Sequence, residues 1–486
     1  MSINKCQRER EGICNKNLKI LHYYWTQYND MEKPGGGIRV YLENIIGIQK
    51  QNDTVYMLNS GVDYDLKHEC YIKEIADKND VKQYSIINSP ILAPSKCSFN
   101  NQKIYLEDKI LADVLDDFLS KNGPFDVIHF HSLEGLSINV LHLKNKFPQT
   151  KFILSLHNYY IFCPQVNLWK NDMESCENYH CGKDCVSCVP NLPNSRLVKF
   201  SYMLSTCLRC INLEKYSEII TRNLKLLYTK HKSRSIVSEK QFDNINNTEF
   251  ERFRTRNIEI INKYIDTVIC VSKRVMQIAV NMGISKDKCQ VAYIGTQFAE
   301  NQITTIKYPI INGILRLLYM GYMRKDKGFY FFVEALENIP PKLAKKIEVV
   351  IAARFDDLVL VDRLKLLKKK FKNIILYNGY THTDIPLITK GVNLGVVPVM
   401  WEDNLPQVAM EMKAMGIPIL ASDRGGASEL TDSVLFKFKA GNTDDFINKI
   451  AQIIYKPQLL NLYYDKHFIL QNNLEHCLIL RKIYGE

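Results

Sequence analysis

Two carboxylates separated by seven residues, Asp403 and Glu411, have the type and spacing suited to holding sugar or ribose hydroxyls. Asp403 follows an apolar run that ends at Val399, and Glu411 lies in the helix predicted next. In an open α/β sheet, ligands bind beyond the carboxyl ends of the strands. We therefore expect both carboxylates at that edge, with the amides of Asn404 and Leu405 facing a diphosphate at the helix start. An acidic surface loop before an exposed helix face would give the same pattern.

A glycine-rich segment, Pro34-Gly35-Gly36-Gly37-Ile38-Arg39, opens the first predicted helix. Adjacent glycines let backbone amides approach a ligand closely, and a helix N-terminus carries partial positive charge, so phosphate is expected at Gly36 and Gly37. The alternative is a flexible turn. The segment lacks the spaced G-x-G-x-x-G and the following acidic residue of a dinucleotide fingerprint, which argues against an NAD enzyme.

His131 and His157 each follow or end an apolar run that is predicted to be a strand. Catalytic side chains gather at such strand ends in α/β proteins. The alternative is that the two histidines cap the core.

Five of the 14 cysteines fall between Cys163 and Cys188. The residues Met1–Asn17 are polar and have no signal-peptide core, so we expect reduced thiols or a metal site rather than disulfides. The Cys185-x2-Cys188 pair has metal-ligand spacing, and Cys176 and Cys181 could complete a structural zinc site with it. The alternative is that these thiols fill the core as small apolar side chains.

Short apolar runs alternate with helix-length amphipathic stretches, which predicts α/β structure with parallel sheets. This alternation of strands and helices begins again after Tyr308. We therefore expect two doubly wound, Rossmann-like domains that face each other across a cleft. The first covers residues 1–298 with an insertion at about 162–257, the second covers 299–456, and a helical tail at 457–486 crosses back to the first. The predicted strands are Leu18–Tyr23, Thr54–Leu58, Asp126–Phe130, Lys151–Leu156, Thr267–Val271, Gln290–Ile294, Leu315–Met320, Ile347–Ile351, Asn373–Tyr377, Leu394–Val397 and Ile417–Ala421.

Several motifs resemble the retaining glycosyltransferases of family 4, which have the GT-B fold and an E-x7-E motif. The resemblance rests on the Asp403-x7-Glu411 spacing with Trp401 before it, and on the segments that surround it. In chain order the matching segments are Gly36-Gly37, Asp126–His131, Leu156-His157-Asn158, Val271-Ser272, Lys327-Gly328, Val397-Pro398, Gly416–Ser422, Gly425-Gly426 and Glu429.

The resemblance implies transfer of a sugar from a nucleoside-diphosphate sugar, with retention, to a hydroxyl acceptor such as a lipid-linked or surface-polysaccharide glycan. Asp403 would bind the donor sugar, Glu411 the ribose, and Lys327 the leaving diphosphate, while His157 would touch the transferred sugar. No catalytic metal or other cofactor is implied. The remaining residues expected to bind substrate are Gly36, Gly37, His131, Arg324, Asn404, Leu405, Gln407, Gly425 and Gly426.

Two positions depart from the family pattern. Asp403 stands where glutamate is usual, and Tyr322 stands where an arginine is usual, so Arg324 or Lys325 would have to supply that positive charge. A sugar-nucleotide epimerase with the GT-B fold and a catalytically inactive nucleotide-sugar-binding subunit therefore stay open as alternatives.

The chain carries a formal net charge of +12, which suits a polyanionic partner. Between Arg196 and Arg234, nine Lys or Arg residues face only Glu214 and Glu218, with apolar residues interleaved. Such a segment can lie on an anionic membrane surface, or it can be a solvated helix packed on the core.

No nucleic-acid-binding signature accompanies the charge. We expect a cytoplasmic protein, either free or peripheral on the inner face of the membrane.

Overall fold

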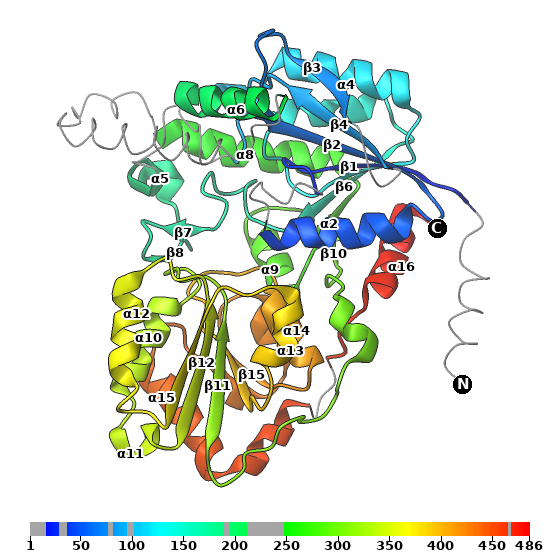
Figure 1. Cartoon of the computed structure of the whole chain (residues 1–486). Helices are drawn as coiled ribbons and strands as arrows, with labels where there is room; N and C mark the ends of the chain where they lie inside the picture. Colours follow the sequence, from blue (N-terminus) through cyan, green and yellow to red (C-terminus); the bar gives the residue numbers. More distant parts are fainter. Residues whose placement is uncertain are drawn as a thin grey trace, which may run out of the picture.

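The structure is a computed structural model, which describes residues 16–28, 36–75, 81–94, 102–188, 195–210, 247–464 and 468–486. It has two α/β domains, one above the other in Figure 1, each built on a largely parallel sheet with helices on its faces. The predicted α/β fold class is confirmed. The segment 211–246, which holds most of the predicted basic stretch, lies outside the described residues, as do Pro34 and Gly35 of the glycine-rich segment.

The N-terminal sheet has the strand order β10-β9-β6-β5-β1-β2-β4-β3, and only β3 runs antiparallel to its neighbour. Its inner strands are buried apolar runs, as expected for a parallel sheet covered on both faces. The register places His22 of β1 opposite His129 of β5. The strands are β1 (Lys19–Tyr23), β2 (Thr54–Asp63), β3 (Tyr71–Ile75), β4 (Lys82–Ile87), β5 (Val127–Phe130), β6 (Lys151–Leu156), β9 (Thr267–Cys270) and β10 (Cys289–Val291).

Helices and one small hairpin surround this sheet. The hairpin consists of β7 (Trp169–Lys170) and β8 (Glu174–Ser175), and it lies between the two domains (Figure 1). The helices are α2 (Gly36–Gln49), α3 (Gln102–Leu106), α4 (Lys109–Asn122), α5 (Lys183–Cys188), α6 (Ser195–Cys210), α8 (Asn247–Tyr264) and α9 (Lys273–Asn281).

The C-terminal sheet is wholly parallel, with the order β13-β12-β11-β14-β15-β16. Its strands are β11 (Leu315–Met320), β12 (Ile347–Ala353), β13 (Asn373–Asn378), β14 (Leu394–Val397), β15 (Ile419–Ser422) and β16 (Lys437–Phe438). Its helices are α10 (Phe329–Asn338), α11 (Pro341–Ala344), α12 (Leu358–Leu367), α13 (Ile385–Ile388), α14 (Gln407–Ala414) and α15 (Thr443–Tyr455).

The C-terminal tail returns to the N-terminal domain, where α16 (Asn473–Tyr484) lies beside α2 (Figure 1). Arg481 of α16 forms a buried ion pair with Asp53, with its Nη1 2.7 and 2.6 Å from the two carboxylate oxygens. Tyr484 bonds Nδ1 of His129 at 2.7 Å, and His476 bonds the Tyr41 hydroxyl at 2.9 Å. The tail therefore forms hydrogen bonds and an ion pair with buried side chains of the N-terminal domain.

The secondary structure differs from the sequence prediction in a few places. The spacing of apolar residues over 135–146 predicts an α-helix there, but the segment contains a 3-10 helix over Ile138–Asn145. The strands β3 and β4 and the helix α4 were not predicted; the two strands are only five and six residues long and mix polar with apolar residues without strict alternation.

Candidate active site

The two domains enclose a cleft of about 1180 Å³. The N-terminal domain contributes the start of α2 from Gly37 to Tyr41, together with His157. The C-terminal domain contributes the loops that follow β11, β13 and β14. The expected residues that line the cleft are Gly37, His157, Lys327, Asp403, Asn404, Leu405, Gln407 and Glu411. The others, His131, Arg324, Gly425 and Gly426, lie outside its lining, and Gly36 begins α2.

Lys327 and Asp403 form an ion pair in the cleft, with Nζ 2.5 Å from Oδ2. Nζ also lies 4.9 Å from the centre of the Trp401 ring. The carboxylate is buried, whereas a quarter of the lysine side chain is exposed (26%). Gly328 makes this approach possible, because at φ +72° it packs so close to the Pro398 carbonyl that a Cβ would lie 1.6 Å from the oxygen. The cleft thus holds an ammonium group that is accessible to an anionic ligand.

Arg324 does not face the cleft. Its Nε and Nη2 atoms lie 2.9 and 2.5 Å from the two oxygens of the buried Asp326, which also accepts a bond from the Lys327 amide at 3.0 Å. This pair shapes the loop that carries Lys327. Tyr322 lines the cleft instead, and its side chain is more than half exposed.

Glu411 is buried and lies beside a residue that the sequence did not single out. Nε2 of His382 is 3.4 Å from Oε1 of Glu411, and this interaction raises the pKa of His382 above its ordinary value. The pair is thus favoured in its charged form, and a ligand hydroxyl bound by Glu411 would meet a carboxylate already oriented by a cation.

Glu402, next to Asp403, is a second residue that the sequence prediction missed. It accepts bonds from Nε and Nη2 of Arg274 at 2.8 and 2.6 Å, from Arg424 at 3.0 Å and from the Gly425 amide at 3.0 Å. Burial acts to raise the pKa of Glu402, but the bonds from Arg274 and Arg424 outweigh it and hold the pKa below its ordinary value. Because Arg274 belongs to α9 of the N-terminal domain, this ion pair joins the domains directly behind Asp403.

Further hydrogen bonds cross between the domains around the cleft. Asn404 donates from Nδ2 to the Leu156 carbonyl at 3.1 Å, and Gln407 donates from Nε2 to the Gly37 carbonyl at 2.9 Å. Glu429 accepts from the amides of Lys273 and Arg274 at the start of α9, at 3.0 and 2.5 Å. The domains are therefore held together by the same segment that carries Asp403.

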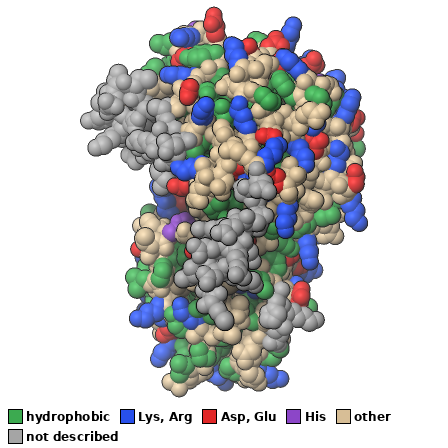
Figure 2. Space-filling view, turned by 90° about the vertical axis from the view of Figure 1, so that its right-hand side faces the viewer, with side chains coloured by type: hydrophobic (Ala, Val, Ile, Leu, Met, Phe, Trp, Pro, Cys, Tyr) green, Lys and Arg blue, Asp and Glu red, His purple; other side chains and the backbone are tan. Residues whose placement is uncertain are grey.

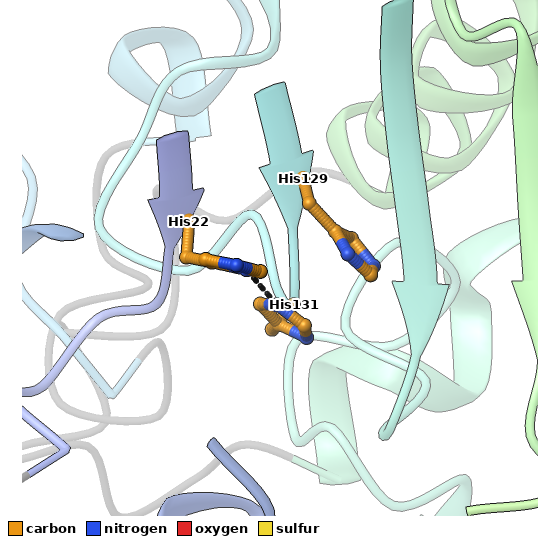
Figure 3. Close-up of side chains that lie close together, drawn as sticks. All are labelled: His22, His129 and His131. Carbon is orange, nitrogen blue, oxygen red and sulfur yellow. Dashed lines mark hydrogen bonds between the residues drawn. The ribbon is translucent and has the colours of Figure 1, made fainter. Parts of the chain in front are cut away.

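His157 ends a chain of hydrogen-bonded side chains that runs back into the core. Nε2 of His157 is 3.2 Å from Nδ1 of His131, whose Nε2 is 3.0 Å from Nδ1 of His22. Nε2 of His22 is 2.7 Å from Oε1 of Gln49. Figure 3 shows His22 on one strand, His129 on the next and His131 just beyond the end of that strand, with the bond between His22 and His131.

This chain fixes the proton on one nitrogen of each ring. Because the Gln49 oxygen only accepts, His22 donates from Nε2, His131 donates to His22, and His157 donates to His131. The Nδ1 atom of His157 is left with its lone pair and has no hydrogen-bond partner among the described residues. Burial lowers the pKa of His157 to about 3 and that of His22 to about 4, so both rings are neutral at pH 7.

His22, His129 and His131 also bring ring nitrogens within 4.8 Å of one another, as metal ligands would be. Each of the six nitrogens already has a hydrogen-bond partner, since His129 bonds Ser155 and Tyr484 at 2.7 Å. This geometry is explained by hydrogen bonding within the core.

Residues 315–456 match the model of the family glycosyl transferases group 1. This part of the chain is therefore similar to a group 1 glycosyl transferase domain, and it contains Lys327, Asp403 and Glu411.

Two curated relatives cover about half of the chain. An uncharacterized 41.2 kDa protein of the cps region of Klebsiella pneumoniae is 22% identical over 253 residues, 51% of this chain. An uncharacterized glycosyltransferase of Methanocaldococcus jannaschii is 23% identical over 271 residues, 53% of this chain. The chain spans 63% and 66% of the length of these two relatives.

Solved structures share the fold over nearly the whole chain. Anabaena HepE in complex with UDP and glucose gives a TM-score of 0.53 at 14% identity, covering 97% of this chain and 100% of that one. A glycosyltransferase from Rickettsia africae ESF-5 gives 0.55 at 15% identity, covering 96% and 98%. The lipopolysaccharide outer core galactosyltransferase WaaB gives 0.55 at 12%, covering 96% and 99%. The chain has the GT-B fold.

Gly425 packs behind Asp403 in the C-terminal domain, and we expect its replacement by alanine to disturb the site. Gly425 has φ +68°, and a Cβ there would lie 2.3 Å from the Asp403 carbonyl oxygen. Gly313 has nearly the same φ, +66°, with open space around it. Gly313→Ala should lose about 1 kcal/mol to backbone strain, and Gly425→Ala at least as much, because its ψ of −177° lies in a region that is essentially restricted to glycine. Gly425→Ala should lose about 1–3 kcal/mol more, because Asp403 must move.

Urea unfolding of the two variants checks this expectation, and equal losses of stability would contradict it.

Proposed function

We propose that this chain is a retaining glycosyltransferase of the family 4 type, which transfers a sugar from a nucleoside-diphosphate sugar to a hydroxyl acceptor. The observation that carries the proposal is the cleft that brings Lys327, Asp403 and Glu411 of one domain opposite His157 of the other. In this proposal Glu411 holds the ribose hydroxyls and Asp403 the hydroxyls of the donor sugar. Lys327 and the amides at the start of α14 hold the diphosphate.

Bond breaking at the anomeric carbon puts positive charge on the sugar and negative charge on the diphosphate. Lys327 is already placed in the cleft, so it stabilises the leaving group without reorganisation, and such a preorganised charge is usually the largest catalytic contribution. The free Nδ1 of neutral His157 would accept a hydrogen bond from a sugar hydroxyl. His131 and His22 would keep that nitrogen unprotonated.

The side chains in the cleft bear on how a retaining reaction would proceed. Among the described residues that line it, the carboxylates are Asp403 and Glu411, and both belong to the donor-side domain. No described carboxylate lines the acceptor side to act as a nucleophile, so we propose that the acceptor attacks the face from which the diphosphate leaves. As the bond to the diphosphate breaks, the acceptor's hydroxyl proton passes to an oxygen of the departing diphosphate.

We further propose that the acceptor is a glycan carried on a lipid and that the chain binds it at the inner face of a membrane. Helix α6 is the described part of the predicted basic stretch, and Tyr202 anchors it by bonding the Ala93 carbonyl at 2.9 Å. Leu197 and Phe200 on the same helix are about half exposed. A relative encoded in a cps region and the fold neighbour named for lipopolysaccharide agree with such an acceptor.

Two observations bear on membrane and nucleic-acid partners. In the described part of the chain, none of the helices is sufficiently long and apolar to cross a bilayer. Basic and acidic side chains are interspersed on the face of the N-terminal domain seen in Figure 2, which is unlike a continuous nucleic-acid-binding patch.

Thermal unfolding with UDP, GDP, ADP or NAD tests the proposed donor site. We expect one nucleoside diphosphate, at about 100 times its dissociation constant, to stabilise the chain by roughly 2.7 kcal/mol. Glu411→Gln should weaken binding about 10- to 100-fold, since it leaves a ribose hydroxyl without its charged acceptor. Glu334→Gln, on the exposed side of α10, is the matched control and should bind as the wild type does.

Turnover then separates the alternatives. A glycoside formed from the matching donor sugar supports the proposed transferase. A donor sugar that is epimerised without an acceptor indicates an epimerase instead, and binding without any turnover indicates an inactive subunit. A shift with NAD alone, or with no nucleotide, would overturn the donor site.

A further inference from the structure

Four cysteines of the segment between β6 and α5 gather at one small pocket. Cys163, Cys176, Cys185 and Cys188 line a space of about 10 Å³, which is about the size needed for one water molecule or metal ion. They come from separate turns of the segment, except that Cys185 and Cys188 lie three residues apart on α5. On a helix this spacing places both thiols on one face. All four cysteines are unpaired thiols.

A buried arginine faces the same pocket. Arg254 of α8 is 4% exposed, and its Nη2 lies 3.5 Å from Sγ of Cys185. Its guanidinium carbon lies 3.7 Å from the centre of the Tyr179 ring. The Nε and Nη1 atoms are buried without hydrogen-bond partners.

The described part of the chain supplies no carboxylate partner for Arg254. Asp184 also lines the pocket, but it is paired with Lys170 and with His180, both at 2.7 Å. A buried cation without a counter-charge costs several kcal/mol. The pocket therefore lacks a negative charge beside Arg254.

We propose that Cys163, Cys176, Cys185 and Cys188 bind a zinc ion as four thiolates, with Arg254 as the counter-charge. Four thiolates and Zn²⁺ carry a net charge of −2, so the site would supply negative charge beside Arg254, whose single positive charge would offset half of it. Burial raises the pKa of Cys163 to about 11 and that of Cys185 to about 12, so without metal both thiols are protonated, and zinc would displace their protons to solvent.

Hydrogen bonds already reach one of the proposed ligands. Sγ of Cys188 accepts from Nε2 of Gln165 at 2.9 Å and from the Asn171 amide at 3.3 Å. Donors of this kind suit a metal-bound thiolate. Among the described residues, only the histidine group has metal-ligating atoms within 4.8 Å of one another, so the four thiols must draw closer when zinc binds.

The ligand set differs from the one that spacing indicates. Cys181 is exposed, has φ +51° and is not part of the pocket lining, whereas Cys163 is buried in it. The metal would thus join the turn after β6 to α5, instead of closing a loop within residues 176–188 alone.

Holding this segment would also stabilise the contact between the domains. Glu177 lies 2.9 Å from Nη1 of Arg424, which also binds Glu402, and Asp172 lies 3.2 Å from Nζ of Lys325. Both contacts reach loops beside Asp403 and Lys327. Figure 1 shows the β7–β8 hairpin at this junction.

Metal analysis of the purified full-length chain tests the proposal. We expect about one zinc ion per chain, and Co²⁺ added to chelator-treated protein should give the absorption of a tetrahedral tetrathiolate complex. Cys163→Ser should lose the metal, whereas Cys181→Ser, in the same segment, should retain it. The Co²⁺ spectrum of the wild type reports the number of thiolate ligands even if Cys163→Ser does not fold.

Three outcomes would overturn the proposal. They are failure of the wild type to bind zinc or cobalt, loss of metal from Cys181→Ser with retention in Cys163→Ser, and iron with sulfide in place of zinc. Each is measured without sugar transfer, so a failed donor-site test leaves this proposal standing.

Discussion

Lys327→Met should lower the rate of sugar transfer by about 10²- to 10³-fold, which is the usual effect of removing one group that stabilises developing negative charge. The ammonium of Lys327 is the cation that pairs with Asp403 in the cleft, at 2.5 Å. Methionine keeps the apolar stem against Trp401 but leaves the diphosphate without this charge. The loss should therefore fall mainly on kcat, because the charge grows in the transition state.

Lys325→Met is the matched control, since Lys325 lies two residues away, is half exposed and pairs with Asp172 outside the cleft lining. Steady-state kinetics with the donor identified by thermal unfolding gives the comparison. Binding of the nucleoside diphosphate should weaken in Lys327→Met while binding of the monophosphate changes little. If Lys327→Met and Lys325→Met have the same kcat and KM, the proposed role of Lys327 in catalysis is wrong.

The second large expected effect is a steep loss of stability as the pH falls from about 6.5 towards 5. Burial lowers the pKa of His157 to about 3 and those of His22 and His476 to about 4, and it holds those of His129 and His131 well below the ordinary value. In the unfolded chain each histidine takes up a proton near pH 6.5, whereas the folded cluster stays neutral. The unfolded state then binds more protons, so acid favours unfolding.

Each of these histidines contributes a slope of about 1.4 kcal/mol per pH unit in this window. Urea unfolding between pH 5 and pH 7.5 measures the combined slope. His476→Gln cannot take up a proton at that site and should reduce the slope by about one such contribution. His68→Gln, at an exposed histidine, should change it little, and a stability that is flat across this range would contradict the prediction.

Much of the fold follows from the sequence because buried parallel strands are continuous apolar runs with helices between them. The predicted inner strands, such as Lys151–Leu156 and Leu394–Val397, have the predicted bounds. The exceptions have physical reasons. β4 (Lys82–Ile87), which lies between β2 and the edge strand β3, mixes polar and apolar residues, and Ile138–Asn145 is a 3-10 helix, whose tighter winding does not follow the α-helical repeat.

In the candidate site, too, some residues could be predicted from the sequence and others could not. Asp403 and Glu411 are predicted from their types and spacing, and Lys327 and His157 from the family resemblance; the structure places all four along one cleft. Their partners come from distant positions. Arg274 reaches Glu402 across 128 residues, and Tyr484 reaches His129 across 355.

The sequence by itself determined most of the order of the strands and helices along the chain, because local periodicity encodes it. It also determined which short segments have charged or polar groups that could bind a ligand, because this follows from residue type. Only the tertiary structure decided that Arg324 shapes a loop, that His131 and His22 orient His157, and that Cys163 lines the pocket of thiols whereas Cys181 does not. These outcomes depend on packing and hydrogen bonds between segments far apart in the chain, and such contacts leave no pattern in the local sequence.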